Sequence, residues 1–430
     1  MKFGFYTLGC KVNLFETQAL MQQARLRGHE ICTHDADAFI LNTCSVTAIS
    51  DHKNLRALHK IRRENPNAII VACGCFAQTE PDKLAASGEV DLICGTSARS
   101  EIIALCEAAV QGRRPQDLQK FRQPSRTYET LPAGVPAGRT RALLKVEDGC
   151  DNYCTYCIIP YARGHVRSIP LREAVQEAQR LAQSGVHEIV LTGIEISSYG
   201  RDLPEQPSLV DLIDALCKAV PQTYLRLGSL EPRTVDQVFC QRLSQHPNLR
   251  PHFHLSLQSG CDRTLARMKR RYTTDFFLQQ CHRLRAAFPD CSITTDLIVG
   301  FPGESEADFM QTLDFLSRCA FSDVHVFPYS PRPGTPAANM PEQIPEAVKA
   351  MRATQAKACA AELSQAYRAQ FIGRTLEVLF EHPIGQGVWS GHSAYCFPVQ
   401  ASHTAISKNI LLPVSITGLS ANGLCGNIVL

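Results

Sequence analysis

Short apolar runs alternate with longer amphipathic segments over most of this chain, and no other feature of the sequence limits the fold as strongly. In the first 112 residues we predict four strands and two helices: strands at 3–8, 38–41, 68–72 and 90–93, and helices at 14–27 and 46–63. Gly28 and the Asn65-Pro66 pair follow the two helices, as is typical of helix ends. Strands that alternate with helices predict a parallel α/β sheet.

A second series of strands and helices fills residues 142–372. We predict six strands, at 142–146, 188–192, 224–228, 252–257, 292–299 and 323–327. Amphipathic helices are predicted between several of them and after the last, at 171–183, 209–219, 304–319 and 346–371. Six βα units in series predict a curved parallel sheet or partial (β/α)6 barrel, whose ligands gather at the carboxyl ends of the strands.

The rest of the chain differs from these two α/β regions. In residues 373–430 we predict short strands at 376–380, 387–389, 394–399 and 410–416, which together suit a small β barrel. Residues 113–141 are rich in Pro and Gly and form a predicted linker. With its flanks (111–145) this linker carries eight Lys and Arg against two acidic residues, which suits either a solvated connector or a contact with a polyanion.

Composition excludes several classes of protein. The chain has 430 residues, and a net charge of +3 is too small for whole-chain electrostatics to indicate nucleic acid, so any basic surface is local. With 44% hydrophobic and 20% charged residues, it is not mainly disordered. The 19 cysteines are an odd number, and no apolar signal segment precedes Cys10, so we expect a cytoplasmic protein with metal chemistry rather than a secreted disulfide scaffold. No apolar run is long enough for a membrane span.

The most specific local motif is a set of three cysteines, Cys150, Cys154 and Cys157, directly after the predicted strand 142–146. Three thiolates on one tight loop can hold a four-iron cubane and leave one iron open for a ligand. A closed zinc site would need a fourth Cys or His nearby, and His165 is the only near candidate. Three unrelated core cysteines are a further interpretation, although free cysteines rarely crowd a polar loop.

Three other cysteines, Cys10, Cys44 and Cys75, each follow a predicted strand of the N-terminal region. The carboxyl ends of parallel strands line one crevice, so these distant residues can converge there and form a second three-thiolate site. Cys94 also ends a predicted strand, and Cys73 lies two residues before Cys75. Because buried strand-end cysteines are often inert, the residues alone leave open which thiols take part.

The spacing Cys-x3-Cys-x2-Cys, with Tyr156 before its last cysteine, resembles the radical S-adenosylmethionine superfamily. Within it, three segments are similar to the cluster motifs of the methylthiotransferases: Leu8-Gly9-Cys10-Lys11-Val12-Asn13, Asn42-Thr43-Cys44-Ser45-Val46-Thr47 and Gly74-Cys75-Phe76-Ala77-Gln78. The likeness covers nearly the whole chain. The first motif most resembles the branch acting on threonylcarbamoyladenosine in tRNA, and sister branches acting on isopentenyladenosine or on a ribosomal protein aspartate share the layout.

This resemblance implies three domains: an auxiliary iron–sulfur domain (1–112), a radical S-adenosylmethionine domain (142–372) and a small β domain of the TRAM type (373–430). It also implies two [4Fe-4S] clusters, each with three cysteine ligands. Cys150, Cys154 and Cys157 would hold the cluster that cleaves S-adenosylmethionine to a deoxyadenosyl radical. Cys10, Cys44 and Cys75 would hold the cluster that presents sulfur, and a second S-adenosylmethionine would supply the methyl group.

The resemblance further places five residues near S-adenosylmethionine: Tyr156, Glu195, Gln258, Gly300 and Gly303. Each also has a structural explanation. Tyr156 could pack beneath its loop, and Glu195 could cap a helix rather than accept the methionine amine. Gln258 lies on the polar face of a predicted strand, where internal hydrogen bonds could satisfy it. Gly300 and Gly303 suit a strand-to-helix turn.

Basic residues suggest a contact with tRNA. The candidates are Arg163, Arg167, Arg267, Arg270 and Arg271, although such clusters are commonly solvated faces. An unstacked base of an anticodon loop can be splayed into a pocket, which suits a buried radical site. From residue 371 to the C-terminus the formal charges cancel, so the TRAM-like domain would hold RNA through shape, histidines and backbone donors.

We therefore predict a cytoplasmic tRNA methylthiotransferase that replaces the C2 hydrogen of threonylcarbamoyladenosine beside the anticodon with a methylthio group. Its partners would be the tRNA anticodon loop, a sulfur donor and an electron donor. An unactivated aromatic C–H offers no acidic proton to a general base, which is why radical chemistry is needed. A noncatalytic iron or zinc protein that binds tRNA, and a thiol redox enzyme, are the alternatives from other classes.

Overall fold

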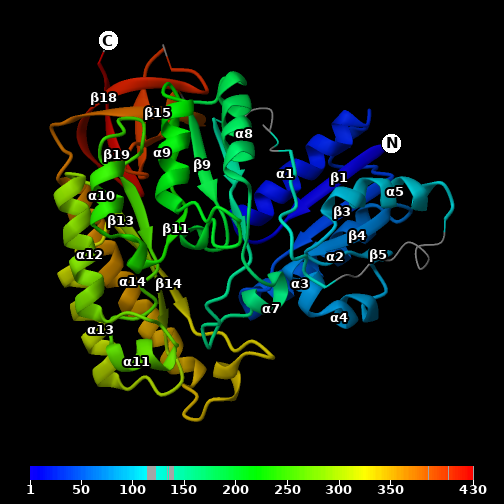
Figure 1. The fold of residues 1–430 in the computed structure, drawn as a ribbon, viewed down its shortest axis with the longest axis horizontal. Coiled ribbons are helices and arrows are strands. Elements are labelled where there is room, and N and C mark those ends of the chain that lie inside the picture. Colours follow the sequence, from blue (N-terminus) through cyan, green and yellow to red (C-terminus); the bar gives the residue numbers. More distant parts are fainter. Residues whose placement is uncertain (114–122, 133, 135–139, 386, 405, 430) are drawn as a thin grey trace.

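The computed structural model describes residues 1–113, 123–132, 134, 140–385, 387–404 and 406–429 (Figure 1). Much of the predicted linker 113–141 lies outside these residues, including Arg114, Lys120, Arg122 and Arg139. The described chain forms an N-terminal α/β domain, a central α/β domain and a C-terminal β barrel. Among the helices of the described part, none combines the length and the apolar character needed to cross a membrane.

The N-terminal domain is a five-stranded parallel sheet with the strand order β2-β1-β3-β4-β5. Its strands are β1 (Lys2–Thr7), β2 (Glu30–Cys32), β3 (Ala38–Thr43), β4 (Ile69–Gly74) and β5 (Leu92–Ile93). Its helices are α1 (Lys11–Leu26), α2 (Ala48–Glu64), α3 (Cys75–Thr79), α4 (Pro81–Ala86) and α5 (Ile102–Val110), with the 3-10 turn η1 (Arg99–Glu101) before α5. The predicted strands and parallel sheet are confirmed, and the short edge strand β2 is an addition.

Side chains that alternate along the strands cover both faces of this sheet. Ile40 and Val71 pack with helices α1 and α5 on one face. Leu41 and Ile70, which are next in sequence to Ile40 and Val71, pack with α2, α3 and α4 on the other face. Because both faces are buried, the strands are almost continuously apolar, as parallel strands between two helix layers require.

The central domain contains seven parallel strands in two sheets, β10-β9-β6 and β11-β12-β13-β14. The strands are β6 (Arg141–Lys145), β9 (Glu188–Thr192), β10 (Tyr224–Arg226), β11 (Ser229–Leu230), β12 (His252–Leu255), β13 (Ser292–Val299) and β14 (Asp323–Pro328). A small antiparallel pair, β7 (Glu147–Asp148) and β8 (Arg167–Ser168), follows β6.

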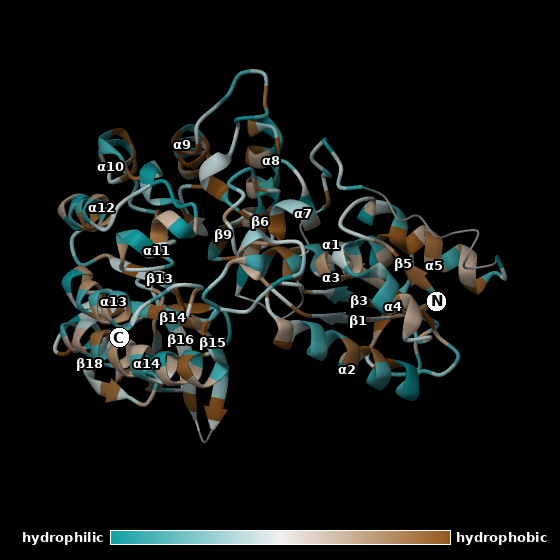
Figure 2. Cartoon of the chain, turned by 90° about the horizontal axis from the view of Figure 1, so that it is seen from below, coloured by the Kyte–Doolittle hydropathy of each residue, from teal (hydrophilic) through white to brown (hydrophobic). Residues whose placement is uncertain are grey.

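Helices surround these two sheets on the outside, and Figure 2 shows α8, α9, α10, α12 and α13 in an arc around the strands. They are α7 (Ile159–Arg163), α8 (Leu171–Gln183), α9 (Leu209–Ala219), α10 (Gln237–Leu243), α11 (Asp262–Arg267), α12 (Thr274–Ala287), α13 (Glu306–Cys319) and α14 (Glu346–Ala369). Short 3-10 turns are η2 (Ile196–Ser198), η3 (Pro232–Thr234) and η4 (Pro336–Asn339). The predicted partial barrel is therefore confirmed.

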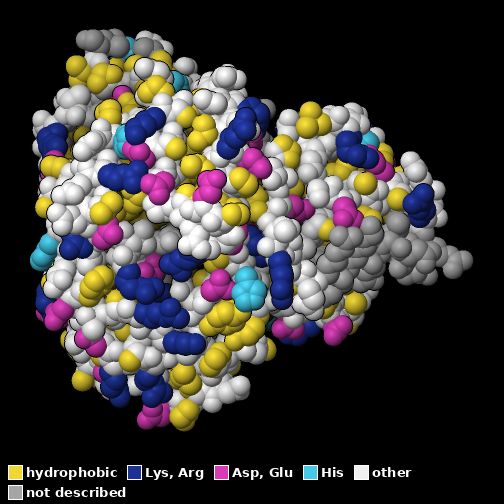
Figure 3. Space-filling view, viewed as in Figure 1, with side chains coloured by type: hydrophobic (Ala, Val, Ile, Leu, Met, Phe, Trp, Pro, Cys, Tyr) yellow, Lys and Arg dark blue, Asp and Glu magenta, His cyan; other side chains and the backbone are white. Residues whose placement is uncertain are grey.

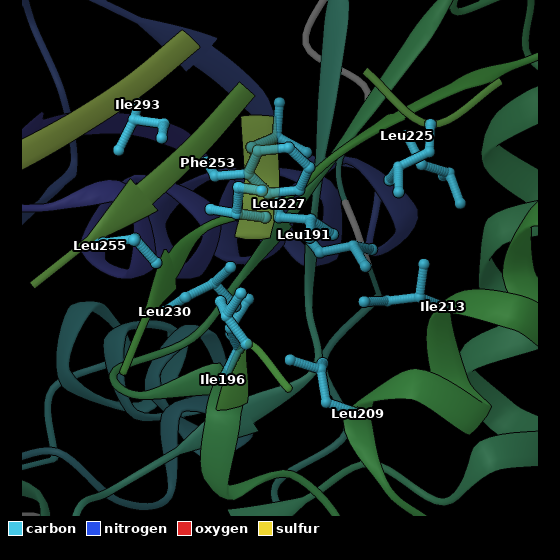
Figure 4. Packing of buried hydrophobic residues seen from close by; sticks show 14 of the residues in the cluster. Leu191, Ile196, Leu209, Ile213, Leu225, Leu227, Leu230, Phe253, Leu255 and Ile293 are labelled. Atoms are coloured by element: carbon cyan, nitrogen blue, oxygen red, sulfur yellow. The ribbon is translucent and has the colours of Figure 1, made fainter. Parts of the chain in front are cut away.

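One predicted strand, 224–228, is divided into β10 and β11 at Leu227 and Gly228. At Gly228 a side chain would place its Cβ only 2.8 Å from the Leu191 carbonyl oxygen, so the chain passes close to β9 here. Leu227, Leu191 and Phe253 close the gap between the two sheets with apolar contacts (Figure 4). The division bends the wall of strands while its core stays continuous.

The C-terminal domain is a closed barrel with the strand order β15-β16-β17-β19-β18. Its strands are β15 (Thr375–Gly385), β16 (Val388–Ser393), β17 (Pro398–Ser402), β18 (Ile410–Ser420) and β19 (Gly423–Ile428). The predicted small barrel is confirmed, although β19 was not predicted. Partly buried ion pairs attach it to the central domain: Arg141 binds Glu381 at 2.7 Å, and Arg250 binds Glu377 at 3.1 Å.

Candidate metal centres

The loop after β6 and β7 brings Cys150, Cys154 and Cys157 to the carboxyl end of the central strands. Gly149 begins this loop with φ +86°, and a Cβ there would lie 2.0 Å from the His165 carbonyl oxygen, so only glycine fits. The Cys150 amide donates to the Gly164 carbonyl at 3.0 Å, and the Cys157 amide donates to the Cys154 carbonyl at 3.0 Å. The backbone is therefore fixed before any metal binds.

A cavity of about 320 Å³ lies in front of these three cysteines. All three sulfurs are free thiols, and Cys150 and Cys154 are largely buried. Burial raises the pKa of Cys150, and burial together with Cys154 raises the pKa of Cys157 to about 12. A bound cation is therefore needed to keep these sulfurs deprotonated, which fits a metal centre.

Three of the five predicted cofactor-binding residues line this cavity: Tyr156, Glu195 and Gln258. Glu195 also caps η2, because its carboxylate accepts the Ser197 amide at 3.1 Å. Gln258 has φ +70° and is held by backbone hydrogen bonds to Asp296 and Ile298 at 2.9 Å, which direct it toward the cavity. Glu195 therefore caps a turn, as its structural interpretation predicted, and it also lines the cavity.

Gly300 and Gly303 were predicted to approach the cofactor, but they do not line the cavity. A Cβ at Gly300 would lie 2.5 Å from Cγ of Lys349, and one at Gly303 would lie 2.5 Å from the Arg267 guanidinium. Both glycines therefore permit close packing inside the protein, and their place beside the cofactor stays a prediction. The carboxylate of Glu304 accepts the Gly300 amide at 2.9 Å and stabilises the turn.

The second set of cysteines converges as the strand positions predicted. Cys10 follows β1, Cys44 follows β3 and Cys75 begins α3 after β4. At Gly9 an added Cβ would lie 3.1 Å from Cβ of Cys44, so the first two loops touch. Asn13 fixes them, since its amide donates to the Leu8 and Thr43 carbonyls at 2.9 Å.

Electrostatics connects the three thiols of this second set. Burial raises the pKa of Cys75 to about 11, and the charges of Cys10 and Cys44 act in the same direction. Cys73, by contrast, is fully buried with Cys94 and Cys106 in the apolar core beneath α5. The side chain of Cys75 therefore lies with Cys10 and Cys44, whereas that of Cys73 points into the sheet's core.

A single buried arginine, Arg163, joins the two sets. Its Nε donates to the Cys75 sulfur at 3.3 Å, and its Nη2 donates to Asn13 Oδ1 at 3.1 Å. Its Nη1 donates to Glu16 at 2.8 Å and to Asp148 at 2.9 Å. Because Asp148 lies just before the Cys150 loop, Arg163 connects the cysteines of the N-terminal domain with those of the central domain.

The carboxylates around Arg163 are ionised although they are buried. Burial opposes ionisation of Glu16, but Arg163, Arg99 and Lys145 hold its pKa below the usual value. Burial also opposes ionisation of Asp148, but neighbouring positive charges outweigh it and hold the pKa of Asp148 well below its usual value. Sequence analysis missed this network, since Glu16 and Asp148 belong to no recognisable spacing pattern.

The five arginines predicted to contact tRNA occupy different environments. Arg163 and Arg167 are 0% and 3% exposed and pair with Asp148, so neither can reach RNA, which corrects that prediction. Arg270 donates to the Cys154 sulfur at 3.3 Å and lines the 320 Å³ cavity. Arg267 is partly exposed and Arg271 exposed, at the end of α11, where Figure 3 shows a group of basic side chains.

Comparison with known proteins tests these interpretations. The model of the radical SAM superfamily matches residues 144–316, and that of the uncharacterized protein family UPF0004 matches residues 2–95. The chain is 38% identical over 381 residues to the threonylcarbamoyladenosine tRNA methylthiotransferase MtaB of Bacillus subtilis (strain 168), covering 88% of this chain and 84% of the relative. The chain belongs to the radical S-adenosylmethionine methylthiotransferases. The predicted family and enzyme class are confirmed.

Other relatives show how this methylthiotransferase relates to the branches of the family. It is 39% identical to MtaB of Aquifex aeolicus (strain VF5), covering 86% of this chain and 90% of the relative. It is 33% identical to the tRNA-2-methylthio-N(6)-dimethylallyladenosine synthase of Chloroflexus aurantiacus, covering 99% and 91%. The identity is higher with the MtaB proteins of Bacillus subtilis and Aquifex aeolicus, over a smaller share of this chain.

Solved structures support the fold. The radical S-adenosylmethionine methyltransferase TsrM of Kitasatospora setae, with cobalamin and a [4Fe-4S] cluster bound, superposes with a TM-score of 0.57 at 14% identity. The match covers 90% of this chain and 80% of TsrM. Membership of the radical S-adenosylmethionine family indicates that the methylthiotransferase uses S-adenosylmethionine and an iron–sulfur cluster.

Proposed function

We propose that this methylthiotransferase converts N6-threonylcarbamoyladenosine beside the anticodon of tRNA into its 2-methylthio derivative. The observation that carries the proposal is the convergence of two separate three-cysteine sets, joined through Arg163. A reaction that removes hydrogen and then adds sulfur needs both functions beside one substrate atom. The names of the MtaB relatives support threonylcarbamoyladenosine as the substrate.

Each cysteine set is proposed to hold one [4Fe-4S] cluster with three protein ligands. Cys150, Cys154 and Cys157 would hold the first, and the cavity in front of them offers room for S-adenosylmethionine at an open iron. When bound, the cluster would cleave S-adenosylmethionine with one electron and yield a deoxyadenosyl radical. Tyr156, Glu195 and Gln258 would orient the cofactor, and the apolar wall at Ile298 would exclude water.

Cys10, Cys44 and Cys75 are proposed to hold the auxiliary cluster. Burial is the main cause that raises the pKa of Cys157, and Cys75 of the second set acts in the same direction, which fits two sets that lie near each other. Val46 and Thr47, two and three residues after Cys44, line the cavity of the first set. A substrate base between the two sets would therefore contact the N-terminal and central domains together.

The tRNA is proposed to bind through local basic residues and shape. Arg267 and Arg271 remain as candidates at the end of α11. The C-terminal barrel, of the TRAM type in this proposal, carries no net formal charge and would contribute backbone donors and shape. A sulfur donor and an electron donor complete the reaction, and a tRNA substrate suits a cytoplasmic location.

Mass spectrometry of tRNA nucleosides tests the substrate. We expect a strain that lacks the gene to lose the methylthio group of threonylcarbamoyladenosine and to regain it when the gene is restored. A loss confined to isopentenyladenosine would move the protein to the sister branch, and an unchanged nucleoside profile would contradict the proposed function. A Cys150→Ala gene serves as the matched control for expression without cluster chemistry.

Arg270 provides a test of the first cluster. Its charged hydrogen bond to Cys154 stabilises the reduced, more negative cluster, so Arg270→Met should lower the reduction potential by roughly 60 mV. Redox titration followed by electron paramagnetic resonance measures this shift. Arg318→Met, which removes an exposed charge on α13, is the control and should leave the potential unchanged. Equal potentials in the wild type and Arg270→Met would argue against a cluster at Cys154.

A further inference from the structure

A second and larger cavity, of about 550 Å³, adjoins the cavity of the first cysteine set. The two share Ser229 and Asp296 as lining residues. The larger cavity begins at Gly9 and Cys10, continues inside the central domain along β12, β13 and β14, and reaches the C-terminal barrel at residues 395–398. Its volume is in the range of sites that hold small molecules. None of the five residues predicted to bind the cofactor lines it.

Two cations line this cavity, Lys11 and Arg368, and Arg368 donates to the Ser364 carbonyl at 3.1 Å. Lys11, the residue after Cys10, lines the cavity and is exposed to it. Within the described part of the chain, its side chain makes no ion pair and no hydrogen bond. The nearby Arg141 and Arg226 differ, since Glu381 and Glu188 neutralise them at 2.7 and 2.8 Å. The positive charge of Lys11 is therefore available to an anionic ligand.

Polar side chains of β12, β13 and β14 also line the cavity. His254 Nδ1 and Thr294 Oγ1 are 3.0 Å apart, and His254 Nε2 lies 3.3 Å from an Asp296 carboxylate oxygen. The rings of His254 and His325 are stacked at 5.9 Å. These groups offer donors and acceptors to a ligand with hydroxyl or amide atoms, and they are a poor environment for an apolar group.

We propose that this cavity binds the threonylcarbamoyl group of the substrate and that Lys11 pairs with its carboxylate. This inference rests on the proposed function. A base whose C2 faces the first cysteine set would lie at the shared wall formed by Ser229 and Asp296. The substituent on N6 then enters the larger cavity, where the threonine carboxylate meets Lys11 and its hydroxyl and urea atoms meet the histidines. A dimethylallyl group would leave these polar groups unpaired.

Binding of defined RNA hairpins to anaerobically prepared holoenzyme tests the role of Lys11. Three anticodon hairpins are compared: one with threonylcarbamoyladenosine, one with the same group as a carboxamide, and one with isopentenyladenosine. We expect the wild type to prefer the carboxylate over the carboxamide by about 10- to 100-fold, as a charge-assisted hydrogen bond implies. Lys11→Met should bind the carboxylate and carboxamide hairpins about equally well, and it should bind the carboxamide hairpin as the wild type does.

Three controls separate recognition from damage. Lys11→Arg keeps the charge and should restore most of the preference. Lys218→Met removes an exposed lysine that pairs with Asp214 on α9, and it should behave as the wild type. The iron content of each variant is measured, because Lys11 adjoins Cys10, and a Lys11→Met protein that has lost iron is replaced in the comparison by Lys11→Gln.

The possible outcomes separate this inference from the proposed function. If Lys11→Met weakens all three hairpins equally, Lys11 contacts a backbone phosphate and the inference is overturned. It is also overturned if the preference for the carboxylate survives in Lys11→Met with full iron content. If the wild type methylthiolates the isopentenyl hairpin and not the threonylcarbamoyl hairpin, the proposed function itself is wrong.

Discussion

Cys150→Ala is expected to reduce formation of 5′-deoxyadenosine to background and to remove about half of the bound iron. The three thiols lie on one hydrogen-bonded loop. Loss of one of them therefore leaves only two protein ligands for a cluster that already has an open iron. The second cysteine set lies in another domain and keeps its own ligands. Iron analysis and chromatography of the reduced protein with S-adenosylmethionine measure the two effects.

A matched control for this prediction is Cys217→Ala. Cys217 is also buried, at 2% exposed, but it packs in the apolar core beside α9 and away from both cysteine sets. This variant should keep full iron and full cleavage, because a small buried cysteine packs much like alanine. Full iron in Cys150→Ala would favour a thiol redox enzyme instead. A wild type that holds iron and forms no deoxyadenosine would favour a noncatalytic tRNA-binding protein.

The order of strands and helices could be predicted because burial on both faces leaves a clear pattern in sequence. The predicted helices 171–183 and 209–219 coincide with α8 and α9, and strand 292–299 coincides with β13. The divided strand at Gly228 could not be predicted, since the close approach to Leu191 depends on a partner 37 residues earlier. Likewise, β19 has the sequence Gly-Leu-Cys-Gly-Asn-Ile, which shows no regular alternation of apolar and polar residues, and its pairing with β18 closes the barrel.

The candidate site was predictable where residues follow strands directly. Cys10, Cys44 and Cys75 converge because parallel strands end at one edge, a property of topology rather than of local spacing. The burial of Arg163 was not predictable. An arginine in a basic stretch suggests a surface, whereas its partners Glu16 and Asp148 lie on an N-terminal helix and a short hairpin. Charge patterns in sequence do not report such long-range pairing.

The second large effect concerns this buried arginine. Arg163→Met should lower the free energy of unfolding by about 3–5 kcal/mol, since it leaves two buried carboxylates without their shared partner. Chemical denaturation monitored by circular dichroism measures the change in the midpoint of unfolding. Arg27→Met is the control at the end of the helix that carries Glu16, because the Arg27 side chain is half exposed and its ion pair with Glu107 contributes less than about 1 kcal/mol.

The dependence on pH identifies the cause of this loss. In the wild type, the pKa of Glu16 lies below its usual value, so the ion pair stabilises the fold above about pH 4 and this contribution fades as the pH falls further. In Arg163→Met, less positive charge offsets the burial of Glu16, so its carboxylate destabilises the fold once it is ionised. The difference between the two proteins should therefore grow as the pH rises from 5 to 8.

A double variant separates lost charge pairing from lost packing. Arg163→Met with Glu16→Gln removes the carboxylate that has lost Arg163 and keeps only Arg99 and Lys145 as partners, so part of the lost stability should return and the dependence on pH should weaken. If the double variant is as unstable as Arg163→Met at every pH, packing of the guanidinium rather than its charge holds the domains together. In that case the link between the two cysteine sets would be steric, and the ionised network around Glu16 would have no part in it.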